Sequence, residues 1–316
     1  MTSHLDSLAR AARPLPRSGV VGAPVIVGFD ESAASVAAVH WAAAEATRLG
    51  SELSVLSAYD PPLQSPTGTG AIRPDSHAWS LCRAAAARGV DLARLGRPDG
   101  VITALGVIGS PAGELVVRSS VTGLVVVGRN RRSALQAAVL GSVSFAVALH
   151  ARCPVVVVGE GAERHPGTSW PVVVGTDGSR PALAAVALAV EFARRWEAPL
   201  EVVSAWRAPS VTDWQDEPDD VLMVRSSAQP WVSRAHTVVD EAIAEVREAA
   251  PELTVTGSVI EGRADDVLVD QSRRAGLVVV GSRGQGGFAG LMVGSVSHGV
   301  MRRSASPVVV VRRGSL

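Results

Sequence analysis

The sequence predicts an α/β protein built from two tandem copies of one domain, each a doubly wound parallel five-stranded sheet flanked by helices. The first observation is an internal repeat: "APVIVGFDESAAS" at Ala23 is answered by "WPVVVGTDGSRPA" at Trp170. The segments that begin at Leu124 and Leu277 also align, without a gap, through the apolar runs at the end of each copy. The second observation is that short apolar runs alternate with amphipathic segments within each copy, as expected for a parallel sheet with helical crossovers.

The repeat sets the expected domain boundaries. We expect a loose, disordered tail over residues 1–22, a first domain over 23–158, a linker over 159–169 and a second domain over 170–316. The tail contains Arg, Pro and Ser and lacks the apolar core of a signal peptide. The linker, "GEGAERHPGTS", has no periodicity and is expected to act as a short hinge.

The elements of the second copy follow from its pattern, and the first copy shows the same order. Short continuous apolar runs are typical of strands covered on both faces. Ser179 is a candidate N-cap, with Pro181 in the first turn of its helix. The expected strands are Val172–Val174, Leu200–Ala205, Leu253–Ile260, Leu277–Val280 and Pro307–Val311, and the expected helices are Ser179–Trp196, Val232–Ala249, Ala264–Arg274 and one that starts at Ser295.

Composition excludes several classes of function. All 30 basic side chains are Arg, so a Walker-type phosphate loop and Schiff-base chemistry are both excluded for lack of lysine. The formal net charge is zero, which gives no general attraction for nucleic acid or for an anionic membrane. No apolar run is long enough to span a bilayer. Cys82 and Cys153 lack a CxxC spacing, so we expect a reducing, cytoplasmic location.

The glycine-rich stretch from Gly281 to Gly294 is the main candidate for a binding site. It leaves a predicted strand and ends at Gly294-Ser295, which opens a predicted helix. The free N–H groups of that helix start, with the hydroxyls of Ser295 and Ser297, could bind an anion. Gly281 and Gly284 could allow close approach of the backbone to phosphate oxygens. The alternative is a loop of small residues that binds nothing.

Asp177 follows the first strand of the second copy, as Asp30 does in the first copy. In a doubly wound sheet, ligands lie outside the carboxyl ends of the strands at the topological switch point, so the Asp and the glycine-rich loop could share one crevice. Each Asp could be a catalytic base, although capping the next helix or accepting a ribose hydroxyl is the simpler reading.

The spacing Gly281-x-x-Gly284, nine residues, then Gly294-Ser295 is similar to the G-2x-G-9x-G-(S/T) motif of the ATP-binding branch of the universal stress proteins. The flanking strands "VVVGTDGS" and "SPVVVV" resemble the same family. The resemblance covers nearly the whole chain as two copies, an arrangement found in many actinobacterial members. It implies the Rossmann-like fold of that family and ATP as the ligand, with Mg²⁺ as a candidate companion ion.

The resemblance also implies the contacts. Asp177 would lie near the ribose and adenine, the backbone around Ala205 would read the adenine edge, and the glycine-rich loop and helix start would hold the phosphates. The implied residues of the second copy are Gly175, Thr176, Asp177, Ala205, Val280, Gly281, Arg283, Gly284, Gly294, Ser295, Val296 and Ser297. Those of the first copy are Gly28, Asp30, Ala58, Gly128, Arg131, Gly141, Ser142, Val143 and Ser144.

The first copy departs from the motif at one position, where Arg131 replaces the second glycine. A side chain there could block close approach of the backbone to phosphate. Alternatively, Arg129, Arg131 and Arg132 could clamp phosphates directly. Both readings stay open, while Asp30, Gly141, Ser142 and Ser144 match the motif.

Other candidates have simpler explanations. His298 has no Cys or Asp at metal-ligand spacing and is expected to be a surface or interface histidine. Ser179 and Ser295 lack the surroundings of a nucleophilic triad. The Trp-rich segment 206–231 could be a flap, a partner-binding loop or a solvated connection.

We therefore predict an ATP-binding universal stress protein whose nucleotide occupancy regulates a stress response or growth. One rival is a slow ATP hydrolase or phosphotransferase that uses Asp177 and a metal ion held by the phosphates. The other rival is a nucleotide-free interaction module. The apolar last strands suit edge pairing, and the family resemblance suggests that the two copies join there. We also expect a homodimer through edge strands and an unidentified regulatory protein as a partner.

Overall fold

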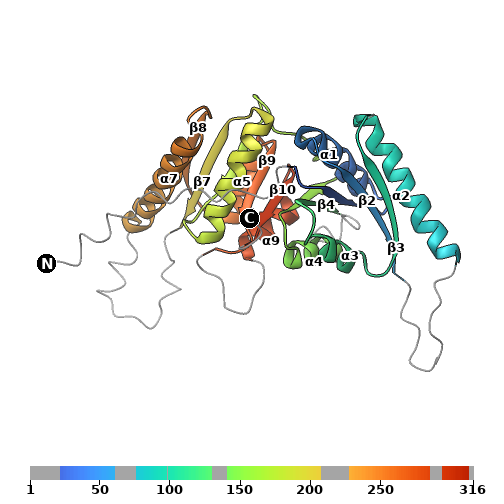
Figure 1. Cartoon of the computed structure of the whole chain (residues 1–316). Coiled ribbons are helices and arrows are strands. Elements are labelled where there is room, and N and C mark those ends of the chain that lie inside the picture. Colours follow the sequence, from blue (N-terminus) through green and yellow to red (C-terminus); the bar gives the residue numbers. More distant parts are fainter. Residues whose placement is uncertain are drawn as a thin grey trace, which may run out of the picture.

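The computed structural model of the chain describes residues 22–60, 76–97, 99–129, 141–207, 228–284 and 294–312. Each half has the predicted α/β order, with strands separated by helices (Figure 1). The first half contains β1 (Val25–Gly28), α1 (Ala33–Leu49), β2 (Leu53–Tyr59), α2 (Ser76–Gly96), β3 (Ile102–Ile108), α3 (Pro111–Arg118), β4 (Leu124–Arg129), α4 (Ser142–His150) and β5 (Val155–Gly159). The second contains β6 (Val172–Gly175), α5 (Arg180–Trp196), β7 (Leu200–Trp206), α7 (Gln229–Ala249), β8 (Val255–Glu261), α8 (Ala264–Ser272), β9 (Leu277–Gly281), α9 (Ser295–Arg303) and β10 (Val308–Val311).

The two parallel five-stranded sheets join into one ten-stranded sheet in the order β3-β2-β1-β4-β5-β10-β9-β6-β7-β8. Within each half every pair of neighbouring strands is parallel. The last strands, β5 and β10, pair antiparallel with Val156 opposite Val309. The predicted joining of the two copies through their last strands is therefore confirmed.

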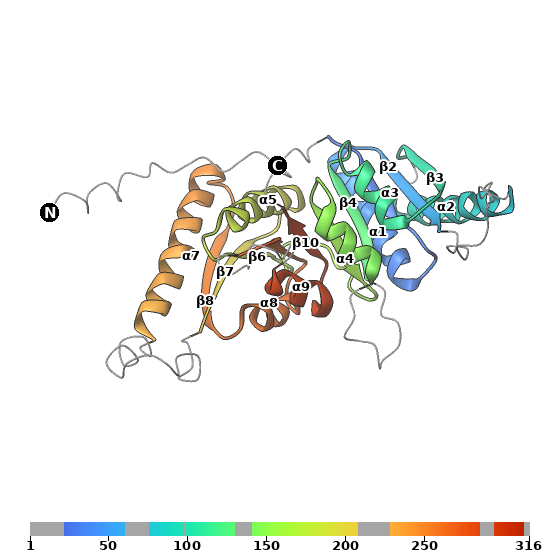
Figure 2. The same ribbon diagram turned by 90° about the horizontal axis from the view of Figure 1, so that it is seen from below.

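Helices cover both faces of the sheet, because the central strands carry apolar side chains on both faces. One core cluster contains side chains of α1, α2, α5 and α7 and runs through both halves. The other contains side chains of α3, α4, α8 and α9. Alternate residues of one strand enter opposite clusters, as Val25 and Ile26 of β1 do. Figure 2 shows α4, α8 and α9 together on the second face.

The ends of the long helices carry the predicted signals. Ser32 and Ser179 are the N-caps of α1 and α5, and their side chains accept hydrogen bonds from Ser35 N and Ala182 N. Pro181 lies in the first turn of α5, as predicted. In each half the candidate site Asp lies in the short turn between the first strand and the serine-capped helix.

The segment that joins the two halves is packed, which corrects the expectation of a hinge. Its first residue, Gly159, is the last residue of β5. Further along, the His165 ring lies between the rings of Trp41 and Trp196, at centroid distances of 6.1 and 4.7 Å. Arg164 donates to the carbonyl oxygen of Arg273 at 3.0 Å. These contacts hold the segment against both halves.

The helix pair α1 and α5 makes a second contact between the halves. Glu45 of α1 is fully buried and pairs with Arg195 of α5. Trp196 Nε1 donates to the other carboxylate oxygen of Glu45 at 2.7 Å. The carboxylate is thus taken out of water with both oxygens hydrogen-bonded, the condition under which a buried charge is tolerated.

No helix in the described residues is long and apolar enough to cross a membrane.

Candidate functional site

Each half has a topological switch point where its first and fourth strands lie side by side. In the first half β1 is flanked by β2 and β4, and in the second half β6 is flanked by β7 and β9. The chain leaves these strands toward helices on opposite faces, so a crevice opens at their carboxyl ends. Asp30 and Asp177 follow the first strand of each half, and Gly128 and Gly281 lie at the carboxyl end of the fourth strand. The predicted meeting of the two motifs is observed.

The carboxylates hold the turn between the strand and the helix. Asp30 Oδ1 accepts from Ser32 N at 3.1 Å and from Ser32 Oγ at 2.5 Å. Asp177 Oδ1 accepts from Ser179 N at 2.9 Å. The helix caps are therefore the serines and not the aspartates, and Oδ2 of Asp177 is directed elsewhere.

Gly284 lies against that second oxygen of Asp177. A Cβ built at Gly284 would fall well inside contact distance of Asp177 Oδ2. The glycine-rich loop and the carboxylate after β6 are therefore in direct contact, although 107 positions separate them in the chain. Only a residue without a side chain leaves both groups where they are.

Gly281 has a packing role at the end of β9. A Cβ at Gly281 would lie 2.8 Å from the carbonyl carbon of Pro181 and 3.0 Å from Ala182 N. A Cβ at Gly128 would likewise meet the backbone atoms of Ala34 and Ser35. These glycines allow the first turn of α5 or α1 to pack on the strand end, so the close partner is the backbone of the protein itself.

The helix α9 starts at the crevice with Gly294 as its N-cap, and no side chain makes a cap hydrogen bond there. Gly294 N donates to Ser282 O at 2.7 Å. The Ser297 hydroxyl is buried and donates to Ser282 O at 3.1 Å, with a second contact to Gly294 O at 3.3 Å. In this structure the Ser297 hydroxyl therefore closes the loop onto the start of α9.

The first-half crevice is a cavity of about 410 Å³. This size lies within the range of small-molecule sites. Its lining includes every described residue that the motif implied for this half: Gly28, Asp30, Ala58, Gly128, Gly141, Ser142, Val143 and Ser144. Arg131 lies outside the described residues, and so does Arg132.

Sequence reasoning missed part of the lining. Phe29 and Leu56, from β1–α1 and β2, contribute apolar surface, and Pro111 and Leu115 come from the start of α3. The available signal was topological, because the helix after the third strand also begins at the carboxyl edge of the sheet. In the second half, Leu268 of α8 occupies the matching place and its side chain packs on Gly175.

The remaining implied residues of the second half lie around the same edge. Thr176 is buried, donates its N–H to Val203 O at 2.9 Å and accepts from Gly178 N through Oγ1 at 3.3 Å. Ala205 lies in β7 and Val280 in β9, while Val296 belongs to the first turn of α9. Arg283 is exposed and lies beside Gly294: a Cβ built at Gly294 would be 3.4 Å from the Cα of Arg283.

Arg129 does not point into the crevice. Its guanidinium is buried between the halves, where Nη1 donates to Met301 O and Nη2 to Ser304 O, both at 2.9 Å. The alternative in which Arg129 clamps phosphates is therefore wrong, because both ends of its guanidinium are bound to the C-terminal end of α9.

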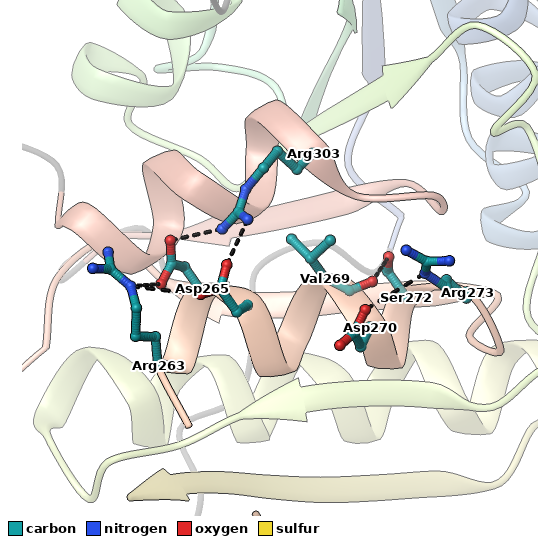
Figure 3. A network of polar contacts seen from close by, with 8 residues as sticks. Arg263, Asp265, Val269, Asp270, Ser272, Arg273 and Arg303 are labelled. Carbon is teal, nitrogen blue, oxygen red and sulfur yellow. Dashed lines mark hydrogen bonds and ion pairs between the residues drawn. The ribbon is translucent and has the colours of Figure 1, made fainter. Parts of the chain in front are cut away.

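An ion network joins α8 to α9 in the second half (Figure 3). Arg303 donates to Asp265 Oδ2 at 2.7 Å and to Asp266 Oδ1 at 2.5 Å. The hydrogen bond from Arg303 lowers the pKa of Asp266. The positions that align with Asp265, Asp266 and Arg303 in the first half are Ala112, Gly113 and His150. The described residues Ala112 and Gly113 have no carboxylate, so these positions cannot form the same ion pairs in the first half.

His298 is an interface histidine, as expected. Its ring meets Phe145 of α4 edge-on at a centroid distance of 5.4 Å. Burial and the neighbouring Arg302 lower its pKa. No group of three or more His, Cys, Asp or Glu that could hold a metal ion occurs among the residues that the structure describes. Residues 208–227 of the Trp-rich segment lie outside those residues.

Comparison with known proteins agrees with this architecture. The family model described as "Universal stress protein family" matches residues 23–159 and 171–312. Universal stress protein Rv2623 of Mycobacterium tuberculosis H37Rv is 33% identical over 304 residues, which cover 93% of this chain and 98% of that protein. The chain belongs to the universal stress protein family.

A solved structure shows the same fold. A universal stress protein from Archaeoglobus fulgidus matches with a TM-score of 0.65 at 19% identity, and the match covers 92% of this chain and 98% of that one. A universal stress protein determined in complex with cAMP matches 46% of this chain and 98% of its own, at 28% identity and a TM-score of 0.35.

Proposed function

We propose that this protein binds ATP in the crevice of its second half and that nucleotide occupancy serves as a regulatory signal in a stress response or in growth control. The observation that carries the proposal is the contact between Gly284 and Asp177 at the switch point, beside the uncapped start of α9. A carboxylate and the first N–H groups of a helix in one crevice suit a ligand with hydroxyls at one part and phosphates at another.

The contacts follow from the chemistry of each group. Asp177 uses Oδ1 for its own turn, and a ribose hydroxyl would donate to the carboxylate. The phosphates would accept from the first N–H groups of α9, which have no acceptor within the helix. Arg283 adds positive charge beside Gly294. The backbone of β7 near Ala205 would face the base.

The first half is proposed to bind a nucleotide as well. The cavity of about 410 Å³ supports this, because its lining unites the Asp after β1, the end of β4 and the start of α4. Gly141 is the N-cap of α4 and, like Gly294, has no side-chain cap. Ser144 Oγ donates to Gly141 O at 3.2 Å, so its proton also closes the loop.

Other parts of the proposal concern the setting of the protein. Mg²⁺ is proposed only as an ion that accompanies the phosphates. Cys82 and Cys153 are free and buried, which supports a reducing, cytoplasmic location. Since β5 and β10 pair with each other within the chain, a homodimer would have to use another surface. We also propose that a regulatory protein is a partner.

The first experiment identifies and counts the nucleotide that freshly purified protein releases on denaturation, by mass spectrometry. We expect ATP, one molecule for each half. A yield of one nucleotide for the whole chain would overturn binding by the first half. Released ADP with steady turnover of added ATP would favour the hydrolase reading, and cAMP in place of ATP would change the proposed ligand.

A second experiment tests the second site by calorimetric titration with ATP. Asp177→Asn removes carboxylate charge, and Gly284→Ala places a methyl group against Asp177 Oδ2. We expect each change to weaken binding at this site by at least about tenfold. Gly96→Ala is the matched control, since nothing lies within 4 Å of the added Cβ. Unchanged affinity in both site variants would overturn the assignment.

A further inference from the structure

Arg129 links the crevice of the first half to a helix of the second. It is the last residue of β4 and directly follows Gly128, which lines the first-half cavity. Its guanidinium donates to Met301 O and Ser304 O at the C-terminal end of α9. The other end of that helix is the Gly294–Ser295 start at the second-half crevice.

A reciprocal link runs the other way. Arg312 Nη1 donates at 3.0 Å to Ala151 O, the C-cap of α4, and α4 begins at the first-half cavity. Arg312 directly follows Val311, whose carbonyl accepts from Ser282 N at 2.7 Å. Ser282 O in turn accepts from Gly294 N. Each crevice is therefore connected to the far end of the helix that opens the other.

The two arginines are not equivalent in the repeat. Arg129 aligns with Ser282, and Arg312 aligns with Gly159. A Cβ at Gly159 would fall well inside contact distance of Arg129 Nη2, so this glycine makes the room for the buried guanidinium. Because different positions make the same kind of contact, the reciprocal arrangement is not a simple consequence of the internal repeat.

We propose that Arg129, a residue of the first half, is a positioning residue for the phosphate end of the second-half site, and that Arg312 has the same role for the first half. The inference rests on the proposed nucleotide binding. A cation at a helix C-terminus is favourable, and buried charged hydrogen bonds are strong. Because a nine-residue helix moves as one rod, fixing its C-terminal end also fixes its N-terminal N–H groups.

The proposal separates two parts of the ligand. The phosphates would meet the start of α9, whose placement depends on Arg129. The ribose and the base would meet Asp177 and the end of β7, which the Arg129 contacts do not touch. Loss of Arg129 should therefore weaken binding of ATP and leave binding of adenosine unchanged, whereas general damage to the fold would weaken both.

The test uses the full chain labelled with ¹⁵N-glycine and follows the Gly294 amide, which reports on the second half alone. Its signal is assigned by its loss in Gly294→Ala. ATP and adenosine are titrated separately into the wild type and Arg129→Met. We expect ATP binding to weaken by about three- to tenfold in the variant. Adenosine affinity should stay the same.

Arg164→Met is the matched control, because Arg164 also donates to backbone carbonyls, but those of Arg273 and Ala275 lie outside α4 and α9. It should change neither affinity. Gly159→Ala is a second variant that keeps the charge of Arg129 and displaces its guanidinium, and it should weaken ATP binding in the same direction.

Two results would overturn the positioning role: unchanged ATP affinity in Arg129→Met, or equal weakening of ATP and adenosine. If the wild type binds ATP and either of these two results is found, the positioning role is overturned and the proposed function stays intact. A wild type that binds no nucleotide overturns both.

Discussion

Glycine is required at Gly128 and Gly281 because helix backbone lies where a side chain would begin. At Gly128 a Cβ would be 2.6 Å from the carbonyl carbon of Ala34 and 2.7 Å from Ser35 N. Neither glycine is among the residues with positive φ. Steric exclusion by the protein itself, and not backbone conformation, is therefore the reason for glycine at these positions. The requirement differs at Gly284, where the neighbour is a carboxylate oxygen that a ligand could share.

This difference predicts that alanine acts differently at the two positions. Gly281→Ala should lower the free energy of unfolding by about 1–3 kcal/mol, since neither the helix backbone nor the strand can move away easily. Gly284→Ala should mainly reduce nucleotide affinity. Urea unfolding followed by circular dichroism measures the first effect, with Gly96→Ala as the control. Equal unfolding midpoints for Gly281→Ala and the control would refute the packing argument.

At the scale of elements, the helix pair α8–α9 is fastened more firmly than its counterpart in the first half. Arg303, at the last turn of α9, joins Asp265 and Asp266 at the start of α8. Asp265 Oδ2 also lies 2.8 Å from where a Cβ at Gly299 would be, so the two helices are close at this point. The network supports α9, the helix that starts at the second-half crevice.

We predict that Arg303→Met lowers the free energy of unfolding by roughly 0.5–1 kcal/mol at low salt, and by less at high salt because the pairs are partly exposed. Since Arg303 lowers the pKa of Asp266, the contribution is present at neutral pH and is lost as the pH falls into the acid range where that carboxyl protonates. Urea unfolding at two salt concentrations measures the effect.

Arg273→Met is the control for that experiment. Arg273 and Asp270 form a longer pair, at 3.5 Å, on the exposed surface at the end of α8 (Figure 3). Such a pair contributes little, so its loss should leave the stability nearly unchanged. If the two variants were equally stable, the α8–α9 network would have no special part in holding α9.

At the scale of the whole molecule, the two halves form one body. The valines of β5 and β10 pair, one core cluster spans both halves, and the linker is held between Trp41 and Trp196 through His165. The guanidinium of Arg48 lies 4.7 Å from the centre of the Trp196 ring. The stacking of the His165 ring and the cation–π contact of Arg48 both stabilise the fold beyond the burial of apolar area.

The stack predicts a pH-dependent stability. Burial, with a smaller effect of Arg48, lowers the pKa of His165 to about 4. The unfolded chain binds this proton near the ordinary pKa of about 6.5, so the contribution is present above that pH and is lost as the pH falls toward 4. The loss should reach about 3 kcal/mol at most.

The measurement compares the wild type with His165→Phe by urea unfolding between neutral pH and pH of about 4. Phenylalanine keeps a ring between the two tryptophans and cannot be protonated, so the variant should gain stability relative to the wild type as the pH falls. His236→Phe, at an exposed position of α7, is the control and should track the wild type. A constant difference between His165→Phe and the wild type across this range would contradict the prediction.

The sequence by itself determined the class, the repeat and the site edge. Continuous valine runs fit only strands buried on both faces, and their alternation with helices leaves a parallel sheet whose ligand edge is known. Ser179 and Pro181 set the start of α5 through local hydrogen bonding and a restricted φ. These features are local or periodic, so they can be predicted without knowledge of distant neighbours.

Only the tertiary structure decided what each side chain faces. It turned Arg129 away from the crevice and onto α9, placed Gly281 against α5, committed the Ser297 proton to the loop and packed the linker around His165. Each of these contacts joins segments far apart in the chain, and local sequence does not encode the partner. The physical reason is that a guanidinium, a missing Cβ or a hydroxyl has the same chemistry beside a ligand as beside another helix.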